Sequence, residues 1–353
     1  WLKNMSAPLK DIPVSLDVPL DADGFCTSFD RTQVDEIRSF FDEFGFVVVH
    51  EVVTPEQCVA TFDEFWDEHR DIGVDRDRPE TWDILWGKPV AKRFSFAGII
   101  GLWSDVSSVR QLQNRQCPEV YDAFATVLRE RCLIVDHDRM GVMRPTVAVP
   151  YESGPVDRPE WRTRANWLHL DCNPHAARKG EGYVSVGSFL QKGDDRDVVD
   201  FTQTLLVQGL ISLTDAREMD GGFHCVPGSH RFSMEWVMEH SPLQSRDNIQ
   251  VSEDDPLQSM VRAVPLRQGS LLVWNQLLFH GNHPNQSSRF RAVQYIRMLP
   301  VGTPFQPLVG LEGCDLPKEF RVSPLGKNLF GFEDWGDRQP PQVVEESGTR
   351  NTT

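Results

Sequence analysis

The 353-residue chain lacks the features that mark several broad classes of protein. It has no apolar run near the roughly eighteen residues that a membrane-spanning helix needs, so no membrane partner is expected. No positively charged apolar leader marks it for secretion. It also has no internal repeat and no Gly/Ser-rich linker. We therefore expect one domain over residues 1–335 and a disordered C-terminal tail over 336–353, with the sequence "GDRQPPQVVEESGTRNTT".

The chain also lacks paired cysteines and an excess of basic charge. Its seven cysteines are scattered without a CxxC pair, which excludes a zinc ribbon and favours free thiols in a reducing, cytoplasmic compartment. Lys and Arg number 36 against 52 Asp and Glu, a net charge of −16. Nucleic-acid binding needs basic patches, so no nucleic-acid partner is expected. The sequence says nothing about the oligomeric state.

Helical patterns occupy the first part of the chain and short apolar strands the second. "TQVDEIRSFFDEFGFVVVHEVVTPEQC" predicts a helix ending at Gly45, a strand, and a second helix opened by a capping box of Thr54 and Gln57. Further helices are expected over 117–131 and 232–240. Strands are expected in "CLIVDHDRMGVMRP", "YVSVGSFL", "TQTLLVQGLISLTD", "SLLVWNQLLFHG" and "RFRAVQYIRMLP". This order predicts an α+β fold with a mainly β core, a sandwich or barrel.

The segment "NWLHLDCNPH" (166–175) places an imidazole and a carboxylate on alternate residues of a predicted strand. His169 and Asp171 would therefore point to the same face. Two such ligands and one distant histidine make a facial triad, which leaves positions on Fe(II) open for a chelating co-substrate and O₂. Alone this motif is a weak signal, because a hydrogen-bonded pair at a strand end has the same letters.

A second segment, "FHGNHPNQSSRFRA" (279–292), carries a histidine and an arginine that fit the first. Arg291 follows His280 by eleven positions across a predicted turn, so both could line one cavity. The planar guanidinium binds both oxygens of a carboxylate. His283 is the alternative distal ligand. Arg289 shares strand parity with Arg291 and is the alternative carboxylate clamp.

Taken in order, His169-x-Asp171, "DGGFHCVPGSHR" and "FHGNHPNQSSRFRA" resemble the phytanoyl-CoA dioxygenase family, as does "FFDEFGFVVVHEVVTPEQC" near the start. The resemblance spans roughly residues 30–300. It implies a double-stranded β-helix, the jelly-roll or cupin-like core, with N-terminal and inserted helices. It also implies a dioxygenase that uses Fe(II), 2-oxoglutarate and O₂ to hydroxylate a small organic molecule, releasing succinate and CO₂.

The same resemblance implies roles for individual residues. His169, Asp171 and His280 would be the iron ligands, and Arg291 would hold the distal carboxylate of 2-oxoglutarate. Asn282 and Met140 would be further co-substrate contacts. The acid of the motif is present as Asp171, which disfavours the halogenating variant of the chemistry.

Several alternatives stay open. A protein side chain could replace the small molecule as substrate, or the jelly roll could be a non-catalytic binding protein with a vestigial metal site. Arg139 is either a substrate anchor or the ion-pair partner of Asp136 or Asp138. Cys172 and His175 could support zinc, but Cys172 has the wrong strand parity and structural zinc needs four ligands.

Substrate identity is not readable from the sequence. Gln208 is a polar residue within an apolar strand and therefore a pocket candidate, while Trp167 and Trp274 could form pocket walls. Residues 187–200 and 239–262 are expected to be insertions, and 71–116 with 239–262 to form a variable lid.

Overall fold

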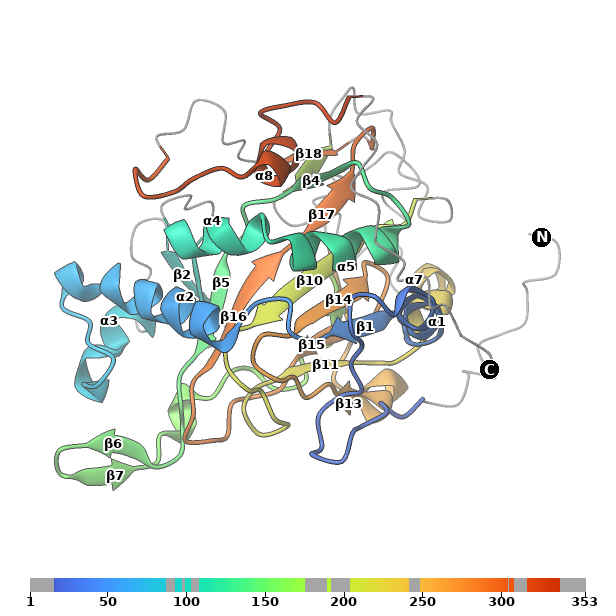
Figure 1. Ribbon diagram of the computed structural model, residues 1–353. Coiled ribbons are helices and arrows are strands. Elements are labelled where there is room, and N and C mark those ends of the chain that lie inside the picture. The colour runs from blue at the N-terminus through green and yellow to red at the C-terminus, as the bar shows by residue number, and fades with distance from the viewer. Residues whose placement is uncertain are drawn as a thin grey trace, which may run out of the picture.

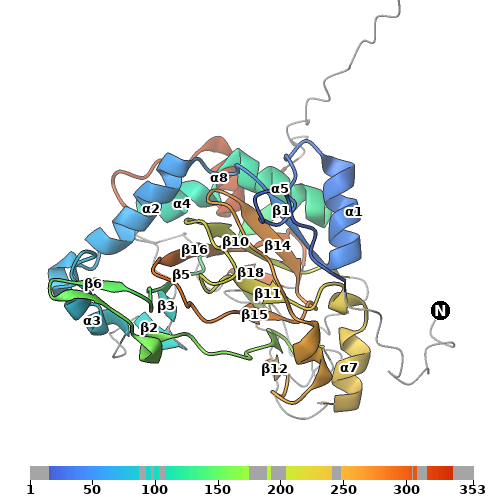
Figure 2. The ribbon, with the colours of Figure 1, turned by 90° about the horizontal axis from the view of Figure 1, so that it is seen from below.

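Two antiparallel β-sheets lie one above the other at the centre of the computed structural model (Figures 1 and 2). The structure describes residues 16–86, 93–96, 99–102, 108–174, 189–191, 204–240, 248–303, 305–307 and 316–336. The predicted fold class, α+β with a jelly-roll core, is confirmed by this arrangement.

The larger sheet contains seven strands among the described residues, all antiparallel to their neighbours. In spatial order they are β1 (Phe46–Val49), β14 (Leu271–Asn275), β10 (Val207–Ser212), β16 (Arg291–Ile296), β5 (Met140–Met143), β3 (Ile99–Leu102) and β2 (Arg93–Phe96). Apart from the adjacent strands β2 and β3, neighbours in space are distant in sequence, as in a jelly roll whose chain alternates between the sheets.

The smaller sheet contains five strands in the part of the chain that is described. In spatial order they are β12 (Ile249–Gln250), β8 (His169–Leu170), β15 (His280–Asn282), β11 (Phe223–Cys225) and β13 (Arg262–Ala263). The register places His169 directly opposite His280. Residues 111 positions apart in sequence therefore become cross-strand neighbours.

Helices cover the larger sheet on the side away from the smaller one (Figure 2). They are α1 (Val34–Phe44), α2 (Pro55–Asp67), α4 (Val109–Arg115) and α5 (Pro118–Leu128). Local sequence sets their ends. Gly45 adopts a left-handed conformation (φ 78°) after α1, and Thr54 and Gln57 form the predicted capping box of α2.

Shorter elements complete the described chain. The helices are α3 (Asp83–Trp86), α7 (Ser233–His240) and α8 (Pro324–Leu329), with 3₁₀ turns at Arg70–Ile72, Pro79–Thr81, Pro159–Trp161, Ser229–Arg231 and Pro256–Met260. The strand pairs are β4 (Leu133–Val135) with β17 (Met298–Pro300), β6 (Val149–Tyr151) with β7 (Gly154–Val156), and β9 (Phe189–Gln191) with β18 (Phe305–Pro307). The predicted helix over 232–240 is confirmed as α7.

The two faces of the larger sheet follow from one buried side chain. Gln294 on β16 forms hydrogen bonds with Asn114 and with the Gln111 carbonyl of α4, so its face is the outer, helix-covered one. Side chains alternate along a strand, and directly opposed residues share a face. Arg291 and Tyr295 therefore lie on the inner face, toward the smaller sheet. A Cβ on Gly209 would lie 2.7 Å from Phe124 of α5, which agrees with this assignment.

Two segments expected to form a lid contain strands that pair with the sheets. Within 71–116, β3 and β2 extend the larger sheet beyond β5. Within 239–262, β12 pairs with β8, and Arg262 begins β13 at the other edge of the smaller sheet. The pairing of these strands could not be read from local sequence, and the expectation that the two segments form a lid stays a prediction.

Other sequence expectations fall largely outside the described residues. These are the tail after residue 336 and, apart from Phe189–Gln191, the segment 187–200. No helix in the described part of the chain is long and apolar enough to cross a membrane.

Candidate metal centre and co-substrate site

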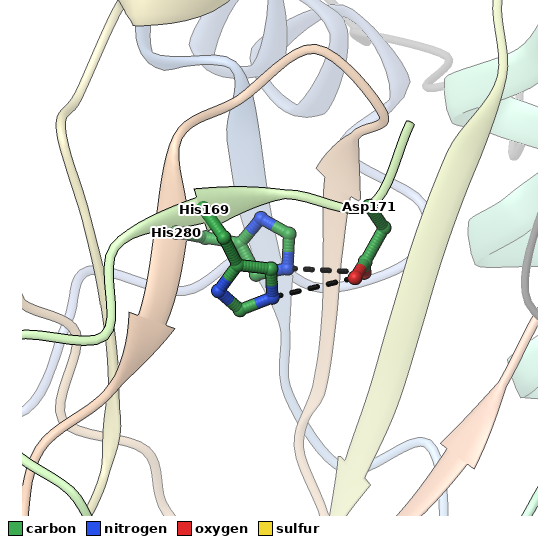
Figure 3. Close-up of side chains that lie close together, drawn as sticks. All are labelled: His169, Asp171 and His280. Atoms are coloured by element: carbon green, nitrogen blue, oxygen red, sulfur yellow. Dashed lines mark ion pairs between the residues drawn. The ribbon is translucent and has the colours of Figure 1, made fainter. Parts of the chain in front are cut away.

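His169, Asp171 and His280 converge between the two sheets (Figure 3). His169 and His280 face each other from β8 and β15, and Asp171 follows β8 by one residue. One ligand atom from each residue lies within 4.8 Å of the other two. No other set of three or more His, Cys, Asp or Glu side chains in the described residues meets this condition.

Backbone carbonyls fix the orientation of both imidazoles. His169 Nδ1 lies 3.1 Å from the Trp167 carbonyl, and His280 Nδ1 lies 2.9 Å from the Leu278 carbonyl. A carbonyl only accepts hydrogen bonds, so each Nδ1 carries the proton and donates it. The Nε2 lone pairs of both rings are therefore left for a metal. Metal-binding histidines commonly donate their other ring N–H to a backbone carbonyl in this way.

The Asp171 carboxylate lies between the two imidazoles. Its Oδ1 is 3.3 Å from His169 Nε2 and its Oδ2 is 3.4 Å from His280 Nε2. Burial acts to raise the pKa of Asp171, but the two imidazoles outweigh burial and hold this pKa well below its usual range. The carboxylate is therefore ionised, as a metal ligand must be.

The donor set fits a divalent transition metal. Two imidazole nitrogens and one carboxylate on neighbouring strands have the composition of the 2-His-1-carboxylate triad that holds Fe(II) with positions open. Aromatic rings surround the histidines: Trp167 stacks on His169 at 4.6 Å, and Trp274 lies 5.3 Å from His280. These rings exclude water from one side of the centre.

Arg291, the arginine expected to bind the co-substrate, lies on the inner face of the larger sheet. It is fully buried at the start of β16, and none of its three guanidinium nitrogens has a hydrogen-bond partner among the described residues. Burial lowers its pKa, which the neighbouring Tyr295 partly offsets. An uncompensated buried guanidinium is costly unless an anion binds it. The arrangement therefore fits an anionic ligand such as a carboxylate.

The alternatives to His280 and Arg291 have other partners. Arg289 forms two hydrogen bonds with the buried carboxylate of Asp220, with its Nη2 2.5 Å from Oδ2. His283 lies outside the cluster of ligand atoms, and its ring packs against His224 at 4.4 Å. Both observations favour His280 as the distal metal ligand and Arg291 as the carboxylate clamp.

Two further predicted contacts lie in different places. Asn282 shares strand parity with His280, and its Oδ1 is buried without a partner in the described structure, so its proposed co-substrate contact stays a prediction. Met140 lies opposite Gln294 and therefore on the outer, helix-covered face. The register places Met143 and not Met140 opposite Arg291, and the co-substrate contact of Met140 stays a prediction. A shift of one residue in register reverses which face a side chain occupies.

Three further candidates from the sequence are Arg139, Cys172 and His175. Arg139 is 2.9 Å from Asp138, so the ion-pair interpretation holds, and its guanidinium also lies over the Tyr295 ring. Burial raises the pKa of Cys172 to about 12, so this thiol is a poor metal ligand. His175 lies outside the described residues.

Sequence reasoning missed Arg297, a buried arginine one residue beyond β16. It shares strand parity with Arg291 in "RAVQYIR", and that spacing was the available signal. Gln208 and Trp274 were identified only as pocket candidates. Leu210 of β10 pairs with Tyr295, which lies on the inner face, and Gln208 is two residues before Leu210, so it lies on the inner face as well. Trp274 is directly opposite Gln208 and therefore shares this face.

Comparisons with known proteins agree with this site. The family model "Phytanoyl-CoA dioxygenase (PhyH)" matches residues 169–293, which begin at His169 and end just after Arg291. A putative phytanoyl-CoA dioxygenase from Dictyostelium discoideum is 27% identical over 364 residues, covering 92% of this chain and 100% of that protein. Dioxygenase cdmD from Talaromyces verruculosus is 27% identical over 178 residues, 49% of either chain.

Among solved structures, the epimerase SnoN in complex with Fe³⁺, alpha ketoglutarate and nogalamycin RO has a TM-score of 0.48 at 14% identity. The match covers 83% of this chain and 93% of that one. The family model and the Dictyostelium relative confirm the resemblance to the phytanoyl-CoA dioxygenase family. With the His-Asp-His site they also confirm the enzyme class, a dioxygenase dependent on iron and 2-oxoglutarate.

Proposed function

We propose that this enzyme hydroxylates a small organic molecule, with His169, Asp171 and His280 as the Fe(II) ligands and Arg291 as the 2-oxoglutarate clamp. The observation that carries the proposal is that two unlike sites lie on the inner side of the sheets, the metal ligands on or beside the smaller sheet and Arg291 on the inner face of the larger one. Two Nε2 atoms and a carboxylate gather within 4.8 Å, and a fully buried guanidinium without a partner in the described residues faces the same interior.

Each residue has a defined task in this proposal. The Trp167 and Leu278 carbonyls hold the two imidazoles in the tautomer that presents Nε2. Asp171 supplies the negative charge that favours a divalent cation. Arg291 orients the co-substrate by binding its distal carboxylate with the planar fork of the guanidinium. Bound iron and 2-oxoglutarate would together activate O₂ for oxidation of the substrate, which is chemistry that the protein itself does not supply.

The protein's own contribution is positioning and exclusion of water. The ligands come from paired strands, which fix their relative positions more rigidly than loops would. Trp274 and Phe223, whose rings lie 5.3 Å and 5.6 Å from His280, form an apolar wall beside the metal position. No side chain is required as a general base.

The proposal is tested by adding Fe(II) and 2-oxoglutarate to the purified protein without oxygen. We expect the weak metal-to-ligand charge-transfer band of a chelated keto acid in the visible spectrum, and succinate formation after oxygen is admitted. A protein that binds iron but gives neither the band nor succinate would support the vestigial binding protein instead. A panel of small molecules and peptides, scored by stimulated succinate formation, separates the two substrate classes.

A further inference from the structure

Three neighbouring strands of the larger sheet, β14, β10 and β16, each contribute one polar side chain to a row of directly opposed residues on the inner face. Trp274 on β14 is directly opposite Gln208 on β10. On the other side of Gln208, the register pairs Gly209 with Ile296, and its continuation by one residue brings Arg297 opposite Gln208. We call Trp274, Gln208 and Arg297 the donor row.

Each member of the donor row has a buried nitrogen without a hydrogen-bond partner in the described part of the chain. These atoms are Trp274 Nε1, Gln208 Nε2 and Arg297 Nη1. The three residues are 3%, 6% and 3% exposed, so bulk solvent does not reach these nitrogens. Buried polar groups normally have partners, and all three of these atoms are donors. The missing group is therefore an acceptor.

The charge around Arg297 indicates that this acceptor is an anion. Arg115, Arg139 and Arg297 lie near Asp136 and Asp138, and Asp171, which also acts on Arg139 and Arg297, is already engaged by the two imidazoles of the metal site. Asp138 forms an ion pair with Arg139 at 2.9 Å, and Asp136 accepts the Arg297 backbone N–H at 2.9 Å. Outside the metal site, the described residues of this cluster place three guanidiniums beside two carboxylates, an excess of one positive charge. A single carboxylate would balance it.

The donor row lies beside the metal position. The Trp274 ring is 5.3 Å from the His280 ring, and Arg297 is near enough to Asp171 for the carboxylate to act on the arginine's pKa. Arg291 is six residues earlier on the same face, about 20 Å away along an extended strand. Strand side chains stand roughly perpendicular to the sheet, so the two guanidiniums serve different parts of the cavity.

We propose that the donor row binds the carboxylate of an anionic substrate and holds that substrate on the Asp171 side of the metal. The substrate class is thus a small organic molecule with one carboxylate, distinct from the 2-oxoglutarate held at Arg291. This inference rests on the proposed oxygenase function, because it assigns the second ligand of the same cavity.

The test measures the preference for an acid over its neutral ester. The protein with Fe(II) and 2-oxoglutarate is titrated without oxygen with hexanoate, phenylacetate, 3-phenylpropionate and cyclohexanecarboxylate, and with the methyl ester of each, by calorimetry. We expect at least one acid to bind at least tenfold more tightly than its ester, which corresponds to about 1.4 kcal/mol. Equal binding of every pair, or no binding of any acid, overturns the proposal.

Variants assign the preference to the donor row. Arg297→Gln should reduce the acid-to-ester ratio to near one, and Arg297→Lys should restore most of it. Gln208→Glu places a negative charge in the row and should weaken the acid at least tenfold while leaving the ester unchanged. Arg262→Gln is the matched control, because Arg262 forms an ion pair with Asp17 at the edge of the smaller sheet. It should keep the wild-type ratio.

The outcomes separate this inference from the proposed function. Absence of the charge-transfer band in wild-type protein contradicts the oxygenase assignment, whatever the acids do. A normal band together with an unchanged acid-to-ester ratio in Arg297→Gln contradicts the donor row alone. Melting temperatures of all variants identify any that fail to fold, and Gln208→Glu then tests the row without changing Arg297.

Discussion

Replacing Arg291 by glutamine should weaken 2-oxoglutarate binding and at the same time stabilise the ligand-free protein. The guanidinium is fully buried and its three nitrogens lack partners in the described residues, so the co-substrate carboxylate would be its counter-ion. Removing one member of a buried, hydrogen-bonded charge pair costs about 2–5 kcal/mol. The dissociation constant for 2-oxoglutarate should therefore rise at least about thirtyfold.

Stability should change in the opposite direction when no ligand is present. Wild-type protein then keeps an uncompensated buried charge, whereas glutamine is neutral and of similar length. Ligand at one hundred times its dissociation constant should stabilise wild type by about 2.7 kcal/mol. For a chain of this size that is a rise of about 4 °C in melting temperature. The variant should show a higher starting melting temperature, and at the same 2-oxoglutarate concentration its rise should be about a third of the wild-type rise or less.

Thermal unfolding with and without 2-oxoglutarate measures both effects, and titration of the charge-transfer band gives the dissociation constant. Arg289→Gln is the matched control, since Arg289 lies two residues away and binds Asp220. It should lower stability without changing 2-oxoglutarate affinity. An unchanged dissociation constant in Arg291→Gln would refute the reasoning, and a weakened one in Arg289→Gln would move the clamp to that residue.

Three other predictions follow from the site and the core. Asp171→Ala should abolish tight Fe(II) binding and succinate formation, measured by metal titration and chromatography, while Cys172→Ser retains both. Gly281→Ala should weaken Fe(II) binding at least about tenfold, because the new Cβ would clash with the Trp167 carbonyl that orients His169. Gly222→Ala is the control and should leave Fe(II) binding unchanged, because the nearest atom to its Cβ, the Arg217 carbonyl oxygen, is 3.5 Å away. Burial lowers the pKa of His137 to about 3, so the unfolded chain takes up the proton first and stability falls as pH drops below about 6.5. Urea unfolding at pH 7.5 and 5.0 should show a loss of about 2 kcal/mol from this residue, which His137→Phe removes; an equal loss in that variant would contradict the assignment.

Features set by neighbouring residues could be predicted from the sequence alone. The capping box of Thr54 and Gln57 and the left-handed Gly45 depend on contacts within four residues, so the ends of α1 and α2 were readable. The common face of His169 and Asp171 follows from strand alternation. Their partner His280 was found because the motif that carries it has its own fixed spacing to Arg291.

Features set by pairing between distant strands could not be predicted in this way. Met140 and Met143 are both plausible inner residues by composition, and only the register of β5 against β16 decides between them. The place of strands β2 and β3 in the sheet was not readable because their pairing is with β5, which is distant in the chain. Arg297 was missed for the same reason, since its neighbour Gln208 lies on another strand.

The two faces of β16 show why missing partners in this protein point to ligands. Gln294 is as deeply buried as Arg291, yet both ends of its amide are satisfied by Asn114 and the Gln111 carbonyl of α4. The fold therefore can provide partners for a buried polar group on this strand where the role is structural. Arg291 and Arg297 lie on the opposite face. All three guanidinium nitrogens of Arg291, and Nη1 of Arg297, have no hydrogen-bond partner among the described residues. Since an unpaired buried charge costs far more than an unpaired amide, two such residues on one face are best explained by two anions that bind there.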